Sequence, residues 1–247
     1  QCLQNAASLG VSGLLFCPSS DENTLLVSAL YPRSLAKVII YRRAYLEDTS
    51  HVYYNNELGG YLSAKYLLKG GHRNIAVFAS FWEFPAKENQ SLLGLLDSPH
   101  RGSYSSLDRL AGCKRAFSEY ELEINPALLY TTGYGFSNGY QTAKELLSTL
   151  KDFSAIICSN DTVAAGVMKA LREQNISVPD EVSAIGYDDS YLTKITDPDL
   201  TSISQEPKQL GRAAFQQLQN LLKGKGKTDV VLDPYIVIRG SSCSVNP

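Results

Sequence analysis

The sequence has few of the side chains that build metal sites and disulfide scaffolds. The 247 residues include three histidines, and their separation does not match the spacing of zinc ligands: His51, His72 and His100. The five cysteines are odd in number, far apart and never arranged as Cys-x-x-Cys: Cys2, Cys17, Cys113, Cys158 and Cys243. We therefore predict no metal site and no cofactor, and we interpret the histidines as structural. Two of the cysteines end apolar segments, where a buried thiol suits a reducing cytoplasm.

Long hydrophobic runs and an excess of positive charge are also absent. No apolar run approaches the roughly 20 residues that span a bilayer, and residues 1–5 lack the charged and apolar regions of a signal peptide. The formal net charge of −2 gives no evident basic face for nucleic-acid phosphates. We therefore expect a cytoplasmic protein that does not contact a membrane, and we expect these residues alone to bind DNA poorly.

What the sequence does contain is a regular alternation of strand-like and helix-like segments. Short apolar runs predict strands at residues 13–17, 36–41, 51–54, 75–78, 128–130, 155–158, 182–187, 201–203, 229–232 and 235–238. Apolar residues at helical spacing predict helices near residues 1–9, from 21 onward, and at 57–69, 107–120, 140–150, 162–174 and 207–222. This alternation predicts a doubly wound α/β architecture, and the length suits one large domain or two small lobes.

Polar residues follow two of the predicted strands and form a candidate ligand site. Asn160 and Asp161 follow one strand, Asp188 follows the next, and a predicted helix joins the two. Because parallel strands present their carboxyl ends at one edge of the sheet, Asn160 and Asp188 are expected to face one crevice. An amide and a carboxylate there suit a polyhydroxylated ligand, since both bind hydroxyl groups. The alternative is that Asn160 and Asp161 cap the following helix, which we consider the better reading for Asp161.

Arg109 is a further candidate, from the start of a predicted helix. An arginine in the first turn gains nothing from the helix dipole, which favours anions at that end. Its planar guanidinium, with five donors, is suited to reach into the crevice. A solvated surface arginine is the competing interpretation.

Aromatic residues supply possible walls and stacking surfaces. Residues 81–106 break the regular pattern and begin with several aromatics, which predicts a long loop with Phe81 and Trp82 in a pocket wall. A loop that packs its own apolar residues explains the same pattern. Tyr134 or Phe136 is predicted as a stacking platform, because the glycines around them do not have the spacing of a dinucleotide-binding loop.

A series of short phrases resembles the regulatory core of lactose/galactose-type (LacI/GalR) bacterial transcriptional repressors. In chain order these phrases are Val11 to Leu15, Asn56 to Gly60, Gly71 to Ile75, Arg109 to Gly112, Ser159 to Asp161, Val178 to Ser183, Gly186 to Asp189 and Leu200 to Ile203. Several are weak alone, but their order is specific and the resemblance extends over nearly the whole chain.

The resemblance implies two doubly wound parallel-sheet lobes, similar to type I periplasmic sugar-binding proteins, joined by three crossing strands with an effector in the cleft. It implies that residues 1–80 with 207–228 form an incomplete amino-terminal lobe. Residues 81–206 with 229–247 then form the carboxyl-terminal lobe, with 81–106 as a loop or insertion. The family's helix-turn-helix and its first strand–helix segment have no counterpart in these residues. By the same resemblance Arg109, Asn160 and Asp188 match effector contacts, Tyr134 lies near the stacking aromatic, and Gln205 lies on a crossing strand.

The implied function is the effector-sensing and dimerisation core of a transcriptional repressor. We expect a neutral mono- or disaccharide as effector, a homodimer, and operator DNA bound only through the helix-turn-helix domain. Related repressors also bind purines and phosphorylated sugars, and the sequence does not separate these. The alternative is a periplasmic-type sugar-binding protein of a transporter. We predict no catalytic residues, although Asp161 and Asp188 would be the pair for an enzyme acting on sugars.

Overall fold

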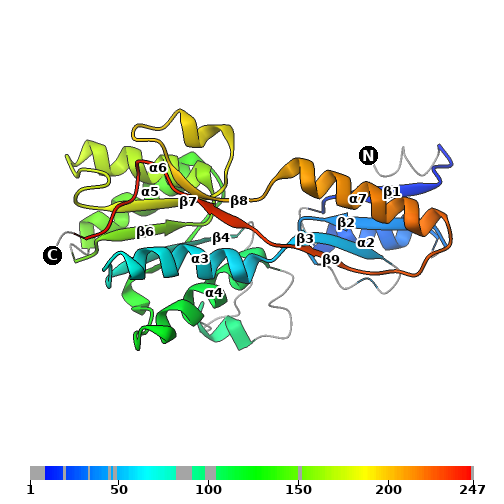
Figure 1. The fold of residues 1–247 in the computed structure, drawn as a ribbon, viewed down its shortest axis with the longest axis horizontal. Helices are drawn as coiled ribbons and strands as arrows, with labels where there is room; N and C mark the ends of the chain where they lie inside the picture. The colour runs from blue at the N-terminus through cyan, green and yellow to red at the C-terminus, as the bar shows by residue number, and fades with distance from the viewer. Residues whose placement is uncertain are drawn as a thin grey trace. The chain divides into compact units, whose positions relative to one another are not determined.

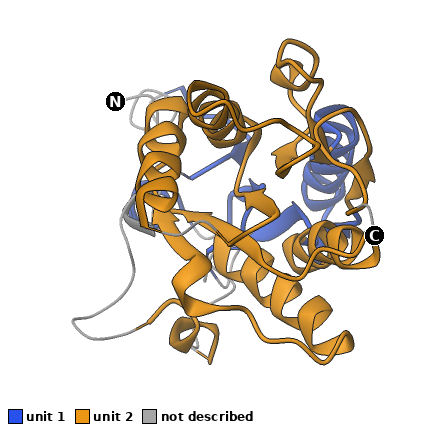
Figure 2. Ribbon diagram, turned by 90° about the vertical axis from the view of Figure 1, so that its left-hand side faces the viewer, with its two compact units in different colours: residues 1–55, 102–104, 206–233 blue, residues 56–101, 105–205, 234–247 orange. Residues whose placement is uncertain are grey.

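The fold consists of two α/β units, each built around its own sheet (Figure 1). The computed structural model describes residues 9–18, 21–32, 34–43, 46, 49–81, 91–97, 104–149 and 152–245. Contacts divide the chain into unit 1, residues 1–55, 102–104 and 206–233, and unit 2, residues 56–101, 105–205 and 234–247 (Figure 2). Both units are discontinuous in sequence.

Unit 1 has a four-stranded parallel sheet in the order β1-β2-β3-β9. Its strands are β1 (Gly13–Phe16), β2 (Ala36–Ile40), β3 (Ser50–Tyr54) and β9 (Val230–Leu232). Helix α2 (Asp21–Leu30) links the first two strands, and α7 (Pro207–Leu222) packs on β1, β2 and β3. A small apolar core joins the sheet to α7 through Val38, Val52, Tyr54, Leu210 and Ala214.

Unit 2 has a six-stranded sheet in the order β10-β8-β7-β6-β4-β5. Five strands are parallel: β4 (Ile75–Ser80), β5 (Leu129–Thr132), β6 (Ala155–Cys158), β7 (Ser183–Asp188) and β8 (Thr201–Ser204). The edge strand β10 (Tyr235–Val237) runs antiparallel to β8. The central strands are buried on both faces, which explains why they read as continuous apolar runs in the sequence.

Two helix pairs cover the sheet of unit 2 (Figure 1). Helices α3 (Asn56–Lys69) and α4 (Ser105–Glu119) pack against each other on one face, and α5 (Phe136–Thr149) and α6 (Asp161–Glu173) pack on the other. The main apolar core lies between the sheet and the α5–α6 pair, around Phe78, Ile156, Val167 and Leu171. The predicted α/β class with parallel sheets is confirmed.

The two largest differences between the units and the expected lobes concern residues 56–80 and 229–233. Residues 56–80 were expected in the first lobe but lie in unit 2, because α3 packs on α4 and β4 occupies the middle of the second sheet. Residues 229–233 were expected in the second lobe but lie in unit 1, because β9 pairs with β3. The boundary at residues 205/206 lies one residue from the expected one.

The remaining differences are local. Helix α5 begins at Phe136, four residues earlier than predicted. Within the expected loop at 81–106, the described residues include a short 3₁₀ helix, η1 (Gly94–Asp97), with Leu95 and Leu96 buried. No helix in the described residues is both long and apolar enough to cross a membrane.

Candidate functional site

The carboxyl ends of the parallel strands in unit 2 form a polar edge. In spatial order, the residues at or just after these ends are Gln205 (β8), Asp188 (β7), Asn160 (β6), Ser80 (β4) and Tyr134 (β5). The strand pairings place the ends of β8, β7, β6 and β4 side by side. This agrees with the expectation that parallel strands present their carboxyl ends at one edge of the sheet. This edge is the candidate site.

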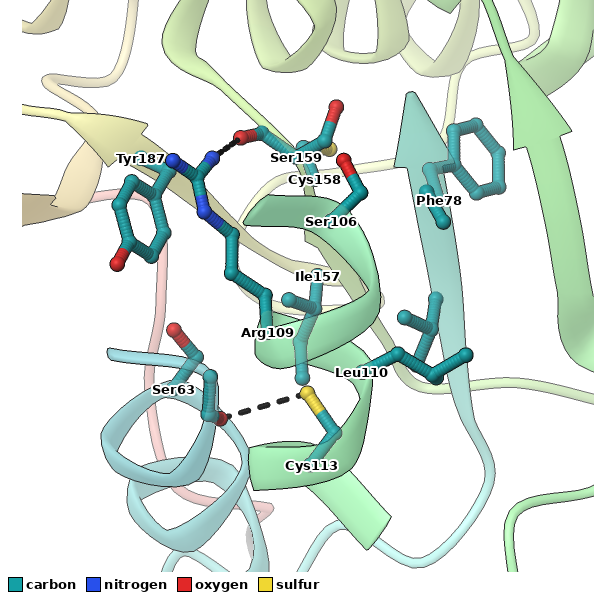
Figure 3. A pocket seen from close by; sticks show the side chains of 13 residues that line it. Ser63, Phe78, Ser106, Arg109, Leu110, Cys113, Ile157, Cys158, Ser159 and Tyr187 are labelled. Carbon is teal, nitrogen blue, oxygen red and sulfur yellow. Dashed lines mark hydrogen bonds between the residues drawn. The ribbon is translucent and has the colours of Figure 1, made fainter. Parts of the chain in front are cut away.

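Arg109 reaches this edge from α4 and is held on three sides. Its Nε donates to Asn56 Oδ1 at 2.9 Å, and Nη1 donates to the backbone carbonyl oxygen of Ser159. The guanidinium carbon lies 3.5 Å from the centre of the Tyr187 ring. Figure 3 shows the guanidinium beside that ring with Nη1 directed at Ser159. The arginine is therefore an organised part of the edge and not a solvated surface side chain.

Two glycines allow α3 and α4 to cross at the backbone and so place Arg109. A β-carbon at Gly60 would overlap the carbonyl oxygen of Arg109, and one at Gly112 would overlap the carbonyl oxygen of Glu57. The α4 backbone at Arg109 therefore rests directly on α3. This contact explains why the phrases around Asn56 and Arg109 both contain glycine.

Tyr187 and Asn56 complete the group around Arg109. Tyr187 is 2% exposed, and its hydroxyl donates to Asn56 Oδ1 at 3.4 Å. Burial raises the pKa of Tyr187 to about 12, against the lowering effects of the nearby Arg109 charge and the nearby Gln205 side chain, so the phenol remains neutral.

Asp188 ends β7 in a strained conformation. Its φ of 102° lies in a region that favours glycine, and Asp189 follows at 53°. Solvent reaches Asp188, yet surrounding protein atoms are dense enough that desolvation raises the pKa of its carboxyl to about 7. The Arg109 charge lowers this pKa and the Asp161 carboxylate raises it. A strained, accessible carboxylate is typical of a functional position.

Asp161 belongs to the scaffold behind Asp188. It is 1% exposed, and its carboxylate accepts from the Ser202 hydroxyl and from the Ser190 backbone N–H, each at 2.6 Å. Burial raises the pKa of Asp161, and these hydrogen bonds lower it. Ser202 also accepts from the Asp189 N–H at 3.1 Å. The network fixes the turn that follows Asp188.

Asn160, not Asp161, caps α6. The Asn160 side chain accepts from the Val163 N–H at 2.8 Å, whereas Asp161 is the first helical residue and points to β8. The cap reading of Asp161 was therefore wrong. Asn160 is 92% buried, and its Oδ1 accepts the capping hydrogen bond. Ligand contact through its amide nitrogen stays a prediction.

The predicted aromatic residues do not join the Arg109 group in the described contacts. Phe136 is exposed and begins α5, while Tyr134 lies between β5 and α5 and is partly buried. Phe81 is 7% exposed, and its N–H donates to Thr132 O at the end of β5 at 3.0 Å, so its backbone continues the pairing of β4 with β5. Its place in a pocket wall stays a prediction. Trp82 lies outside the described residues.

Arg109 also lines a small cavity, and Figure 3 draws the side chains that surround it. Its lining includes Ser63, Leu110, Cys113 and Ile157. The cavity volume that is open to the centre of a water molecule is about 20 Å³. This is room for one water and not for a sugar ring. The cavity is therefore a packing space between the α3–α4 pair and the sheet of unit 2, and not the candidate ligand site.

Sequence reasoning missed the roles of Asn56 and Tyr187. Both appeared there only as parts of family phrases. One signal was available for Tyr187: strand alternation places its side chain on the face opposite to Asp188, where a large polar aromatic requires a partner. Among the described residues, no cluster of three potential metal ligands occurs.

Comparison with known proteins gives a consistent result. Residues 64–243 match the family described as periplasmic binding protein-like domain. A relative named HTH-type transcriptional repressor PurR, from Histophilus somni (strain 2336), is 29% identical over 242 residues, which cover 97% of this chain and 67% of the relative. The chain thus spans about two thirds of that relative's length.

Two solved structures resemble the whole chain. One is described as a complex of the transcriptional regulator CelR with cellobiose; it has a TM-score of 0.79 and 23% identity, covering 97% of this chain and 68% of the other. The second is a LacI family transcriptional regulator from Enterococcus faecium with bound ribose; it has a TM-score of 0.79 and 22% identity, covering 99% of this chain and 84% of the other. At these identities the likeness shows the shared fold.

Proposed function

Because this chain belongs to the periplasmic binding protein-like family and is an effector-binding core of the LacI/GalR type, we propose that it binds a small neutral sugar. The proposed place is the cleft that the family resemblance implies, with the carboxyl edge of the unit 2 sheet as one wall. The sugar is a mono- or disaccharide, like the ribose and the cellobiose bound in the two similar structures.

The observation that carries this proposal is the combination of Arg109 and Asp188 at one sheet edge. Arg109 is held in place by neutral partners, so it keeps its charge for other acceptors. Asp188 is accessible and lies near enough to Arg109 for the guanidinium to lower its pKa. A fixed donor beside an accessible carboxylate can bind neighbouring hydroxyl groups of one sugar ring, with the carboxylate as a charge-assisted acceptor.

The same pair favours a neutral ligand over a phosphorylated one. A phosphate near Arg109 would also face the Asp188 carboxylate, and the repulsion would act against the attraction of the guanidinium. A neutral sugar uses both groups without this conflict. Protonation of Asp188, made easier by its raised pKa, would be needed to admit an anionic effector.

For the full-length protein we propose a homodimeric repressor that binds operator DNA through a helix-turn-helix domain outside these residues. The effector would control DNA binding by having different affinities for two arrangements of the units. A sugar-binding protein of a transporter would share the family match, but the relative from Histophilus somni, which covers 97% of this chain, is named a transcriptional repressor. The chain is not an enzyme, in keeping with its repressor relatives and with the commitment of Asp161 to structural hydrogen bonds.

Calorimetric titration against ribose, galactose, cellobiose, hypoxanthine and ribose 5-phosphate tests the proposal. We expect saturable binding of at least one neutral sugar. Binding confined to hypoxanthine would overturn the sugar assignment, and binding confined to ribose 5-phosphate would overturn the argument from charge.

The role of Asp188 is tested with the sugar that binds. Asp188→Ala is expected to weaken binding at least about 100-fold, because charged hydrogen bonds to the ligand are lost. Asp199→Ala is the matched control, since Asp199 is an exposed aspartate in the loop before β8. Equal affinity of the Asp188 variant and the control would remove Asp188 from the site.

Light scattering tests the proposed homodimer. We expect a mass of two chains at high protein concentration. A monomer with full effector binding would contradict dimerisation through these residues.

A further inference from the structure

We propose that Asn56 and Tyr187 are positioning residues of the effector site, which hold the Arg109 guanidinium in one pose before the effector binds. The inference deepens the proposed function and rests on it for its effect on affinity. Its geometric part, the restraint on Arg109, stands on the described contacts alone.

Asn56 is placed to restrain Arg109 without neutralising it. It is the first residue of α3 and is 5% exposed. Its Oδ1 accepts from both Arg109 Nε, at 2.9 Å, and the Tyr187 hydroxyl, at 3.4 Å. An amide oxygen has two lone pairs and can serve two donors. Because the amide is neutral, the guanidinium keeps its full charge for the ligand.

Tyr187 restrains the same group from its flat side. The guanidinium carbon is 3.5 Å from the ring centre, within the range of a cation–π contact. The ring is itself held in place, because it is 2% exposed and its hydroxyl donates to Asn56 Oδ1. A β-carbon at Gly59 would overlap this hydroxyl, so the α3 backbone forms the boundary of the tyrosine pocket.

The Ser159 carbonyl completes the restraint from β6. With Nη1 directed at this oxygen and Nε at Asn56, both the direction and the rotation of the planar group are set. An arginine side chain has several free torsions, and ordering it on binding costs free energy. A site that orders it beforehand avoids that cost when the ligand arrives.

The restraint is tested first without any ligand, by ¹⁵N NMR of the Arg109 Nε–H group. The signal is assigned by its absence in Arg109→Lys. In the wild type we expect slow exchange with water, and in Asn56→Ala exchange at least about tenfold faster, as for the loss of one hydrogen bond of about 1.4 kcal/mol.

Four further variants make this test specific. Asn56→Asp keeps the acceptor oxygen and is expected to keep the protection, which also covers the case that the alanine variant does not fold. Tyr187→Phe keeps the aromatic ring and its ring-current shift on the Nε–H signal, whereas Tyr187→Leu loses that shift. Asn125→Ala removes an exposed asparagine that accepts from the Ala127 N–H at 3.0 Å, and it should leave the Arg109 signal unchanged. Unchanged protection in Asn56→Ala would overturn the proposal.

The effect on affinity is measured with the first member of the sugar panel that binds. We expect Asn56→Ala to weaken its binding about tenfold in the wild-type background. In Arg109→Lys, which lacks Nε–H, the same substitution should have no further effect. Additive losses would show that Asn56 acts apart from Arg109 and would overturn the positioning role. If no panel member binds, the proposed function fails, and the NMR result still decides the restraint.

Discussion

One aspartate begins α6, just after β6, another ends β7, and the two carboxylates have opposite surroundings. Asp161 is buried and accepts from Ser202 and Ser190, whereas Asp188 is exposed and has a strained backbone. Both have a raised pKa because protein atoms displace water around them. The raised pKa therefore does not separate the two roles.

What separates them is the use of their hydrogen-bonding capacity. Asp161 joins α6 to β8 and to the turn after β7, so its oxygen atoms are occupied by the protein. Asp188 lies on the turn that this network fixes, and strain at such a residue persists only where the surrounding structure holds it. Asp161 thus stabilises the backbone next to Asp188, and the Asp188 carboxylate stays accessible to solvent.

The largest expected effect is the loss of Asp161. Asp161→Ala should lower the free energy of unfolding by about 3 kcal/mol, because the buried Ser202 hydroxyl and Ser190 N–H lose a charged acceptor. Urea denaturation measures the change. Asp199→Ala, at an exposed position, should stay within about 0.5 kcal/mol of the wild type. Similar losses in the two variants would break the comparison.

Gly186→Ala should give the next largest effect, because it forces a methyl group into the Asp161 network. A β-carbon there would overlap Asp161 Oδ1 and lie 2.8 Å from Leu200 Cδ2. We expect a loss of about 2 kcal/mol in urea denaturation. Gly211→Ala is the control: a β-carbon at this position in α7 meets nothing within 4 Å, and the variant should gain about 0.5 kcal/mol. Unchanged stability of Gly186→Ala would mean that the Asp161 carboxylate can be displaced without cost.

The pH dependence of effector affinity sharpens the role of Asp188. If the ionised carboxylate binds a neutral sugar, affinity should rise about tenfold between about pH 6 and about pH 8, as a group with a pKa of about 7 ionises. Calorimetric titration at several pH values measures this rise. An anionic effector would show the opposite slope, and Asp188→Asn should abolish the slope.

The smallest expected effect is a gain of stability in Asp188→Asn. Because the folded-state pKa of Asp188 is raised, the folded chain keeps a proton between about pH 4 and about pH 7 that the unfolded chain has lost. Stability from this group is therefore present at low pH and declines as pH rises through that window. The stability of Asp188→Asn should not show this decline, because asparagine does not ionise.

We expect that gain to be about 1 kcal/mol at about pH 8 and absent at about pH 4, with the full shift discounted because solvent reaches the carboxylate. Urea denaturation at both pH values measures it. A variant that is less stable than the wild type at about pH 8 would indicate that the protein uses the Asp188 charge for its own stability.

The sequence predicted the elements well, because their signals are local. The strands β4, β6 and β7 are continuous apolar runs, and α7 begins at Pro207 as predicted. The polar edge was predicted from topology, since the parallel strands β6 and β7 place Asn160 and Asp188 at the same carboxyl edge of the sheet. Each of these inferences needs only residues close in sequence and one rule of connection.

The environment of Arg109 was not predictable in the same way. Its partners Asn56, Ser159 and Tyr187 come from three elements, and their meeting depends on the crossing of α3 and α4 at glycines. The exchange of roles between Asn160 and Asp161 has a different cause. Both residue types cap helices, and a shift of one residue in the helix start decides which side chain does so.

The pairing of β9 with β3 has a consequence for the order in which the chain is completed on the ribosome. The strands β1 to β3 are synthesised before unit 2, but their sheet gains its fourth strand and the covering helix α7 only after residues 207–232 have been made. Residues 56–205, which emerge between them, carry five strands and four α-helices of unit 2 in their described part. The sheet of unit 1 is thus completed only after unit 2 has been made, and until then we expect its β3 edge to be open to pairing with other chains.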